Sequence, residues 1–397
     1  MMMGVLLAIM LAARATAACA DEQSAAPKFI EGSTAKVCQL TGDFDRSRGQ
    51  PAISRTGERF GVPATDLGNA FEHKGRLYFL FGDTWAPGAR WMRDPIAYTT
   101  SADSEKIELQ FPVDDDGKFR PINVPGIRHL VFEVPGGGIS VGDTMYIVFV
   151  TDHSPKKIMG RAVLAASEDD GYNFKYLYDL STEKFLNVAM AEVKPGQIEG
   201  LPTPADTVLI WGSGEYRRSN PYLACIPSEK IRDKSAIRYF AGLDESGKPI
   251  WKESETDAVS LFEHPTIGEF SVVWCDQLRH WFMLYNSMFP RGIVFRCAKN
   301  PWGPWSDAQI IFNPLRDGYG IFMHSPLFKE ADGVHLSDVG REKTWGGEYG
   351  PYMLKRYFRG DSRRCTIYYA MSTWNPYQVM IMRSDIGYPG KESQGGQ

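Results

Sequence analysis

Two aspartates in the N-terminal part of the chain are candidates for carboxylate chemistry. Asp66 lies where an extended segment begins, in Thr-Asp-Leu-Gly, and Asp83 lies where the next one ends, in Phe-Gly-Asp-Thr. Hydrolysis of a glycosidic bond needs two carboxyl groups, one protonated to assist the leaving oxygen and one ionised to attack or to activate water. Crowded acids in a partly desolvated site acquire separate pKa values. The alternative is structural, with Asp83 as a turn residue and Asp66 as part of a strand entry.

Further polar and aromatic residues lie beside Asp83 and at equivalent points of later segments. Arg217 is suited to bind a sugar hydroxyl or to hold a carboxylate ionised, and Trp85 and Trp374 offer flat faces on which a sugar ring can stack. For the acidic members of this group a purely structural role is an even alternative. The candidate substrate-binding residues are Trp85, Glu215, Arg217, Glu269, Asn286, Trp374 and Asn375.

Metal and cofactor chemistry has little support in the sequence. His153 and His324 stand apart, without the spacing of a ligand set. The five cysteines beyond residue 20 are scattered and contain no Cys-x-x-Cys, which excludes a typical zinc site. We therefore expect no metal and no cofactor, and at most one or two incidental disulfides.

The candidate residues are predicted to be held by a repeated β-hairpin. A run rich in apolar and aromatic residues, bounded by Gly, Asp or Asn, recurs and is typical of strands. Long amphipathic helical patterns are nearly absent. The runs cover residues 77–84, 145–152, 208–213, 281–287 and 366–373, and legible companion strands cover 161–166, 221–226, 292–297 and 378–383.

The spacing of these hairpins indicates a repeat architecture. Equivalent points at residues 82, 151, 212, 286 and 372 are separated by 69, 61, 74 and 86 residues. Four-stranded sheets arranged radially form a propeller, so we predict an all-β, five-bladed β-propeller. A two-sheet sandwich is the alternative, but nearly every repeat supplies three or more strands.

The blade geometry predicts one shared site. In an up-and-down blade, the start of the first strand and the end of the second lie on the same face. We therefore expect Asp66, Asp83, Glu215 and Glu269 to open onto one cavity at the mouth of the propeller. Glu199 and Asp152 are expected to be loop residues instead.

The first residues read as an export signal. An apolar run, Gly4 to Ala13, is followed by small residues up to Ala20, although no Lys or Arg precedes it. Cleavage before Asp21 or lipidation at Cys19 are the two alternatives. We predict a signal peptide at residues 1–20, an N-terminal extension at 21–50, the propeller at 51–387 and a flexible tail at 388–397. The protein is then periplasmic, in the cell envelope or extracellular.

Composition excludes several partners. The chain has 44 basic and 48 acidic residues and no basic run. Nucleic acid and anionic membrane surfaces are therefore not expected as partners. Beyond the leader, no segment approaches 18 apolar residues, so we expect no membrane span, and we expect a monomer.

Several motifs, in order, resemble one known family. They lie at residues 63–68 (Pro-Ala-Thr-Asp-Leu-Gly), 78–84, 220–222, 268–274, 300–305, 349–352 and 371–379. Together they resemble the family named domain of unknown function 4185, part of which is classified as glycoside hydrolase family 183. The similarity runs from about Val62 to Ser384.

This resemblance implies a function as well as a fold. The classified members are endo-D-arabinanases with a five-bladed propeller, so it implies a furanose polysaccharide such as D-arabinan as substrate. It also implies that the paired aspartates of the first blade, here Asp66 and Asp83, are catalytic. A non-catalytic propeller of the cell envelope, binding a glycan or a protein, stays open as the alternative.

Overall fold

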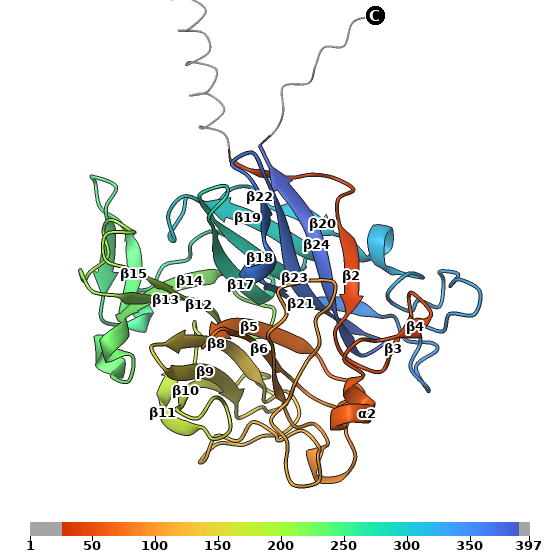
Figure 1. Ribbon diagram of the computed structural model, residues 1–397. Coiled ribbons are helices and arrows are strands. Elements are labelled where there is room, and N and C mark those ends of the chain that lie inside the picture. The colour runs from red at the N-terminus through yellow and green to blue at the C-terminus, as the bar shows by residue number, and fades with distance from the viewer. Residues whose placement is uncertain (1–25, 389–397) are drawn as a thin grey trace, which may run out of the picture.

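Five antiparallel sheets form the body of the protein in the computed structural model, which describes residues 26–388. Figure 1 shows these sheets arranged as blades around a common axis. From the axis outward, blade one contains β5 (Leu67–His73), β6 (Arg76–Phe81) and β7 (Ile96–Thr99). Blade two contains β8 (Pro135–Val141), β9 (Thr144–Thr151), β10 (Arg161–Ser167) and β11 (Lys175–Ser181).

The other three blades continue the same order. Blade three contains β12 (Asn187–Val193), β13 (Thr207–Ser213), β14 (Pro221–Pro227), β15 (Arg238–Leu243) and β16 (Pro249–Lys252). Blade four contains β17 (Ile267–Cys275), β18 (His280–Met288), β19 (Arg291–Ala298) and β20 (Gln309–Phe312). Blade five is built on β21 (Gly347–Met353), β23 (Arg364–Trp374) and β24 (Gln378–Gly387), with the short β22 (Arg359–Gly360) beside β23. The predicted five-bladed propeller is confirmed.

Contacts between the innermost strands close the ring. Each innermost strand packs against the next, in the order β5, β8, β12, β17 and β21, and β21 packs back against β5. Close approach at the axis explains the glycines of β8. A Cβ added to Gly137 would lie 2.6 Å from the backbone oxygen of Val188, and one added to Gly138 would lie 2.6 Å from the ring of Phe71. Larger residues would therefore push neighbouring blades apart.

Apolar side chains fill the space between blades. Successive residues of a strand point to opposite faces of its sheet. On β6, Phe79 and Phe81 belong to the cluster shared with blade five, whereas Tyr78 and Leu80 belong to the cluster shared with blade two. The same alternation gives one apolar cluster at each of the five blade interfaces. This explains why the predicted second strands are apolar throughout.

N-terminal residues complete the last blade. β1 (Lys28–Phe29) and β2 (Ala35–Gln39) both pair antiparallel with β24. The region assigned from sequence to an N-terminal extension, residues 21–50, therefore supplies the outer strands of blade five. It also forms a small ribbon of β3 (Phe44–Asp45) and β4 (Gln50–Pro51).

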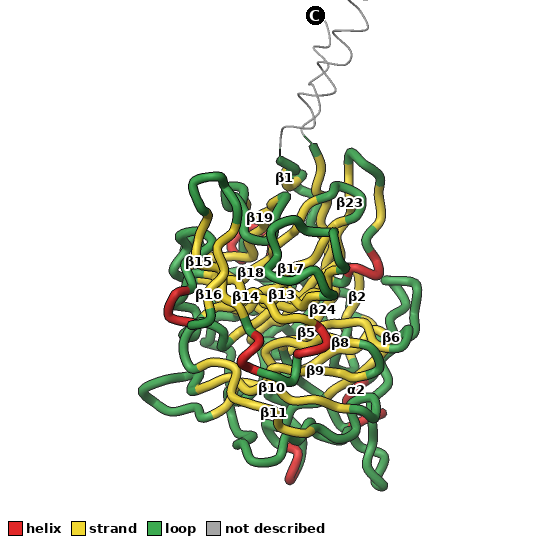
Figure 2. Tube along the Cα trace, turned by 90° about the vertical axis from the view of Figure 1, so that its left-hand side faces the viewer, coloured by secondary structure: helices red, strands yellow, loops and turns green. Residues whose placement is uncertain are grey.

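Helices are short and peripheral. The α-helix α2 (Thr56–Phe60) has five residues, and the helical segments visible in Figure 2 are short stretches within the connections between strands. Within residues 26–388, no helix is long enough and apolar enough to cross a membrane. The expected signal peptide, Cys19 and the tail beyond residue 388 lie outside the described residues.

A buried ion pair ties β2 to the ribbon, and its loss should destabilise the fold. The Lys36 Nζ lies 2.6 Å from Asp45 Oδ1, with side-chain exposures of 3% and 2%. Lys36→Ala leaves the Asp45 carboxylate buried without its cation, so the free energy of unfolding should fall by about 3–5 kcal/mol in urea titration. Arg55→Ala, which breaks an exposed pair with Glu58, is the control and should cost less than about 1 kcal/mol. Equal losses in the two variants would contradict this role.

Candidate active site

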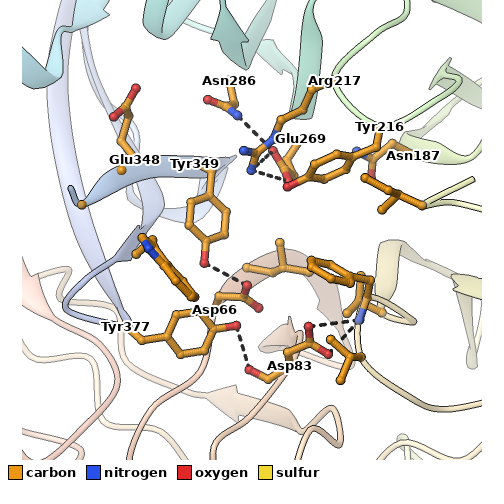
Figure 3. A pocket seen from close by; sticks show the side chains of 18 of the residues that line it. Asp66, Asp83, Asn187, Tyr216, Arg217, Glu269, Asn286, Glu348, Tyr349 and Tyr377 are labelled. Carbon is orange, nitrogen blue, oxygen red and sulfur yellow. Dashed lines mark hydrogen bonds and ion pairs between the residues drawn. The ribbon is translucent and has the colours of Figure 1, made fainter. Parts of the chain in front are cut away.

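A cavity of about 460 Å³ lies at the end of the axis where the innermost strands begin. All five blades contribute to its wall. Figure 3 shows polar side chains converging on it from opposite sides. The polar and aromatic residues that line it are Asp66, Asp83, Trp85, Phe132, Asn187, Tyr216, Arg217, Glu269, Asn286, Arg291, Arg341, Trp345, Glu348, Tyr349, Tyr352, Trp374 and Tyr377.

Asp66 is the more deeply enclosed carboxyl group of blade one. It precedes β5, and the Tyr349 hydroxyl donates a 2.9 Å hydrogen bond to its Oδ2 (Figure 3). Its Oδ1 is buried and has no hydrogen-bond partner. Burial, followed by the nearby charge of Asp83, raises the pKa of Asp66 to about 8. Asp66 therefore retains its proton at neutral pH.

Asp83 lies on the same wall in a different environment. It follows β6 and is 8% exposed. The Phe132 N–H donates to both of its carboxyl oxygens, at 3.2 and 3.1 Å. Burial raises the pKa of Asp83 to about 6, while the hydrogen bond from Phe132 opposes the rise. At neutral pH, Asp83 is therefore mostly ionised next to a protonated Asp66.

An ion pair with an amide forms the opposite wall. The Arg217 Nη2 lies 3.0 Å from Glu269 Oε1, and Asn286 Nδ2 donates to Glu269 Oε2 at 3.2 Å. The Arg217 guanidinium also lies over the rings of Tyr216 and Tyr349, 4.6 and 5.3 Å from their centroids. Arg217 thus keeps Glu269 compensated and fixed in place.

A guanidinium occupies the space between the two predicted stacking residues. Arg341 lies 4.0 Å from the ring centroid of Trp85 and 3.9 Å from that of Trp374. Trp85 also stacks on Tyr377, with centroids 5.2 Å apart. Both indoles line the cavity, as predicted, but a sugar ring would have to use the surface that Arg341 leaves open.

The structure places two of the predicted binding residues away from the lining. Asn375 is fully buried, and its side chain holds a loop by accepting from Asp338 N and donating to the carbonyls of Arg341 and Thr344. Glu215 accepts a hydrogen bond from the N–H of the next residue, at 3.2 Å, outside the lining. The expectation of one shared cavity therefore holds for Asp66, Asp83 and Glu269 but not for Glu215.

The sequence profile of one family covers most of the chain. The family described as Domain of unknown function (DUF4185) matches residues 52–383. The chain belongs to the DUF4185 family.

Two curated fungal proteins are similar to it. Notoamide biosynthesis cluster protein J' of Aspergillus versicolor is 27% identical over 313 residues, 71% of this chain and 82% of that protein. Notoamide biosynthesis cluster protein J of Aspergillus sp. strain MF297-2 is 28% identical over 305 residues, 68% and 77% of the two chains.

Solved structures with a related fold share little sequence with this DUF4185 protein. An exo-β-1,3-galactanase from Phanerochaete chrysosporium is 9% identical with a TM-score of 0.47, covering 88% of this chain and 64% of that chain. The alignment thus spans less than two thirds of the galactanase. An arabinanase from Bacillus subtilis is 10% identical with a TM-score of 0.40, covering 80% and 94%. Because both TM-scores are below 0.5, these similarities carry no argument about function.

Several lining residues of this DUF4185 protein were missed from the sequence. Asn187 begins β12 and Glu348 lies at the start of β21, so the rule about strand starts could have found both. Tyr216 adjoins Arg217, and Tyr377 follows Trp374 after a short turn. Arg341 has no comparable signal, because it lies in the long irregular segment between β20 and β21.

Unsatisfied polar atoms gather around this cavity. Buried polar groups in proteins are nearly always hydrogen-bonded. Lining side chains depart from this rule at Asp66 Oδ1, Arg217 Nε, Arg341 Nη1, Glu348 Oε2 and Tyr352 OH. A ligand with several hydroxyl groups could satisfy many of them. Among the described residues, no three His, Cys, Asp or Glu side chains are grouped to hold a metal ion.

The raised pKa of Asp66 predicts a pH-dependent gain in stability when this carboxyl is removed. An unfolded aspartate has a pKa of about 3.9, whereas folding raises that of Asp66 to about 8. Between these values the folded state binds more protons, so the free energy of unfolding falls as pH rises. Asp66→Asn should therefore raise the melting temperature relative to wild type more at pH 9 than at pH 4. Asp152→Asn, whose carboxylate pairs with Arg161 outside the cavity, is the control. An equal shift of the Asp66 variant at both pH values would contradict the burial of the charge.

Proposed function

We propose that this protein is an exported, endo-acting glycoside hydrolase that cleaves internal bonds of a furanose polysaccharide such as D-arabinan. The observation that carries the proposal is the pair of carboxyl groups on one cavity wall with separated pKa values. Asp66, with a pKa of about 8, is the general acid. Asp83, with a pKa of about 6, is the ionised partner. Export rests on the signal-like residues at the start of the sequence.

The two aspartates divide the reaction between them. Asp66 donates its proton to the glycosidic oxygen as the bond to the anomeric carbon breaks. Asp83 either attacks that carbon or removes a proton from an attacking water. The Tyr349 hydroxyl donates a hydrogen bond to Asp66 Oδ2. This hydrogen bond becomes stronger when Asp66 gives up its proton and becomes anionic. The neighbouring N–H of Phe132 holds the Asp83 carboxylate in position.

The charge balance of the cavity supports an uncharged substrate. The carboxylates of Glu269 and Glu348 are each paired, with Arg217 at 3.0 Å and Arg291 at 3.4 Å. Asp66 is neutral at neutral pH. One further cation on the lining, Arg341, offsets the charge of the ionised Asp83. A site without a net charge suits a neutral sugar polymer better than a polyanion.

Loss of either aspartate should abolish hydrolysis without unfolding the protein. Asp66→Asn and Asp83→Asn keep the size and a hydrogen-bond acceptor but can neither ionise nor donate a carboxyl proton. Each should lower the rate of oligosaccharide release from D-arabinan by about 10²–10⁴-fold or more. Asp152→Asn should cost less than about tenfold.

The substrate panel should separate this proposal from its alternatives. It should contain plant and mycobacterial arabinans, and also small glycosides, since the two fungal relatives are named for a biosynthesis cluster. Binding without release by the wild type would indicate a glycan-binding propeller instead. If both aspartate variants hydrolyse the substrate at near wild-type rates, the assignment of Asp66 and Asp83 is wrong. Glu269 and Glu348, the other carboxyl groups of the lining, are then the candidates for the catalytic pair.

The pH dependence should be bell-shaped. The kcat/KM should rise with pH as Asp83 ionises, through about 6, and fall as Asp66 loses its proton, through about 8. The measurement is the initial rate of arabinan cleavage from pH 4 to pH 10 at a substrate concentration below KM. Activity that keeps rising from pH 7 to pH 10 would exclude Asp66 as the acid.

A further inference from the structure

Two cysteines from neighbouring blades meet in the core. Cys275 is the last residue of β17 in blade four, and Cys365 is near the start of β23 in blade five. Both are fully buried in the apolar cluster between these blades. Both sulfurs lie within hydrogen-bond distance of the same side-chain oxygen, Gln277 Oε1, at 3.4 Å for Cys275 and 3.8 Å for Cys365. Each thiol also shifts the pKa of the other, because the two lie close together.

The other described cysteines are in different surroundings. Cys38 and Cys297 donate to main-chain carbonyls, at 3.6 and 3.5 Å. Burial raises the pKa of Cys38 to about 12 and that of Cys297 to about 11. By contrast, the hydrogen bond from Cys365 lowers the pKa of Cys275. Since the thiolate is the nucleophile in disulfide exchange, Cys275 is the better attacking group.

We propose that Cys275 and Cys365 form a disulfide that joins blades four and five under oxidising conditions. The oxidant is a low-molecular-weight disulfide such as oxidised glutathione. The Cys275 thiolate attacks one of its sulfurs and releases one thiol, and the Cys365 thiolate then attacks the mixed disulfide and releases the second. Both cysteines together lose two electrons and two protons, and the oxidant gains them as two thiols. This proposal does not depend on the proposed glycosidase activity.

The position of the pair makes the reaction feasible and useful. Asp276, next to Cys275, has a side chain that is 65% exposed, so local opening of the turn after β17 gives the oxidant access. The bond would close the segment 275–365, which includes the irregular region that carries Arg341. Such a closure stabilises mainly by restricting the unfolded chain.

Peptide mapping tests the bond directly. The full chain is produced in the bacterial periplasm, and a second sample is incubated with oxidised glutathione. Free thiols are alkylated under denaturing conditions, and the protein is digested without reduction and analysed by mass spectrometry. We expect a cross-linked pair of peptides containing Cys275 and Cys365, with Cys38, Cys225 and Cys297 alkylated. Recovery of both thiols alkylated in both samples would overturn the proposal, as would Cys275 linked to any other cysteine.

A stability measurement provides a second readout. The oxidised wild type should melt about 5 °C or more above the reduced form. This difference should disappear in Cys275→Ser/Cys365→Ser and persist in the matched control Cys225→Ser, which removes a buried thiol elsewhere. An unchanged redox-dependent difference in the double variant would assign the effect to other cysteines and refute the bridge.

Discussion

The packing of the five innermost strands around one axis is the constraint on which the rest of the structure depends. Because β21 returns against β5, every blade has two neighbours and no blade can tilt without disturbing the ring. Apolar clusters at all five interfaces make this closure favourable. The glycines of β8 show how little room is left at the axis. The N-terminal strands β1 and β2 then cover the edge of β24, which would otherwise be a free strand edge in the last blade.

The same closure creates the site. Strand starts from all blades point toward one end of the axis, where main-chain hydrogen bonding ends and side chains become free to face a cavity. Water is partly excluded there, so burial has the largest effect on the pKa values of ionisable groups and the charges of neighbouring groups have the next largest. The raised pKa of Asp66 shows both effects in this order. Asp83 differs because a backbone N–H reaches its carboxylate. Two identical side chains on one wall thereby acquire different proton affinities.

The fold was largely predictable because its signals are local. The apolar second strands at 77–84 and 366–373 can be read from composition alone, and their recurrence gives the number of blades. The carboxylates at strand starts and ends followed from the same geometry, as Asp66, Asp83 and Glu269 show. The contribution of residues 28–39 to blade five was not predictable, because pairing of β2 with β24 joins residues more than 300 positions apart. No local sequence pattern indicates that these two distant strands pair.

One misplaced site residue, Asn375, and one missed residue, Arg341, have a common physical cause. Asn375 directly follows Trp374, which lines the cavity. Its side-chain amide, however, makes three hydrogen bonds to the loop that carries Arg341 and so does not face the cavity. That loop has no strand or helix pattern, so neither its path nor its entry between Trp85 and Trp374 can be derived from sequence. The consequence is functional as well as structural. Asn375 holds the main chain of Arg341 in place, so it helps to set the shape of one side of the cavity without lining the cavity itself. The faces of Trp85 and Trp374 that a ligand can reach therefore depend on the buried amide of Asn375.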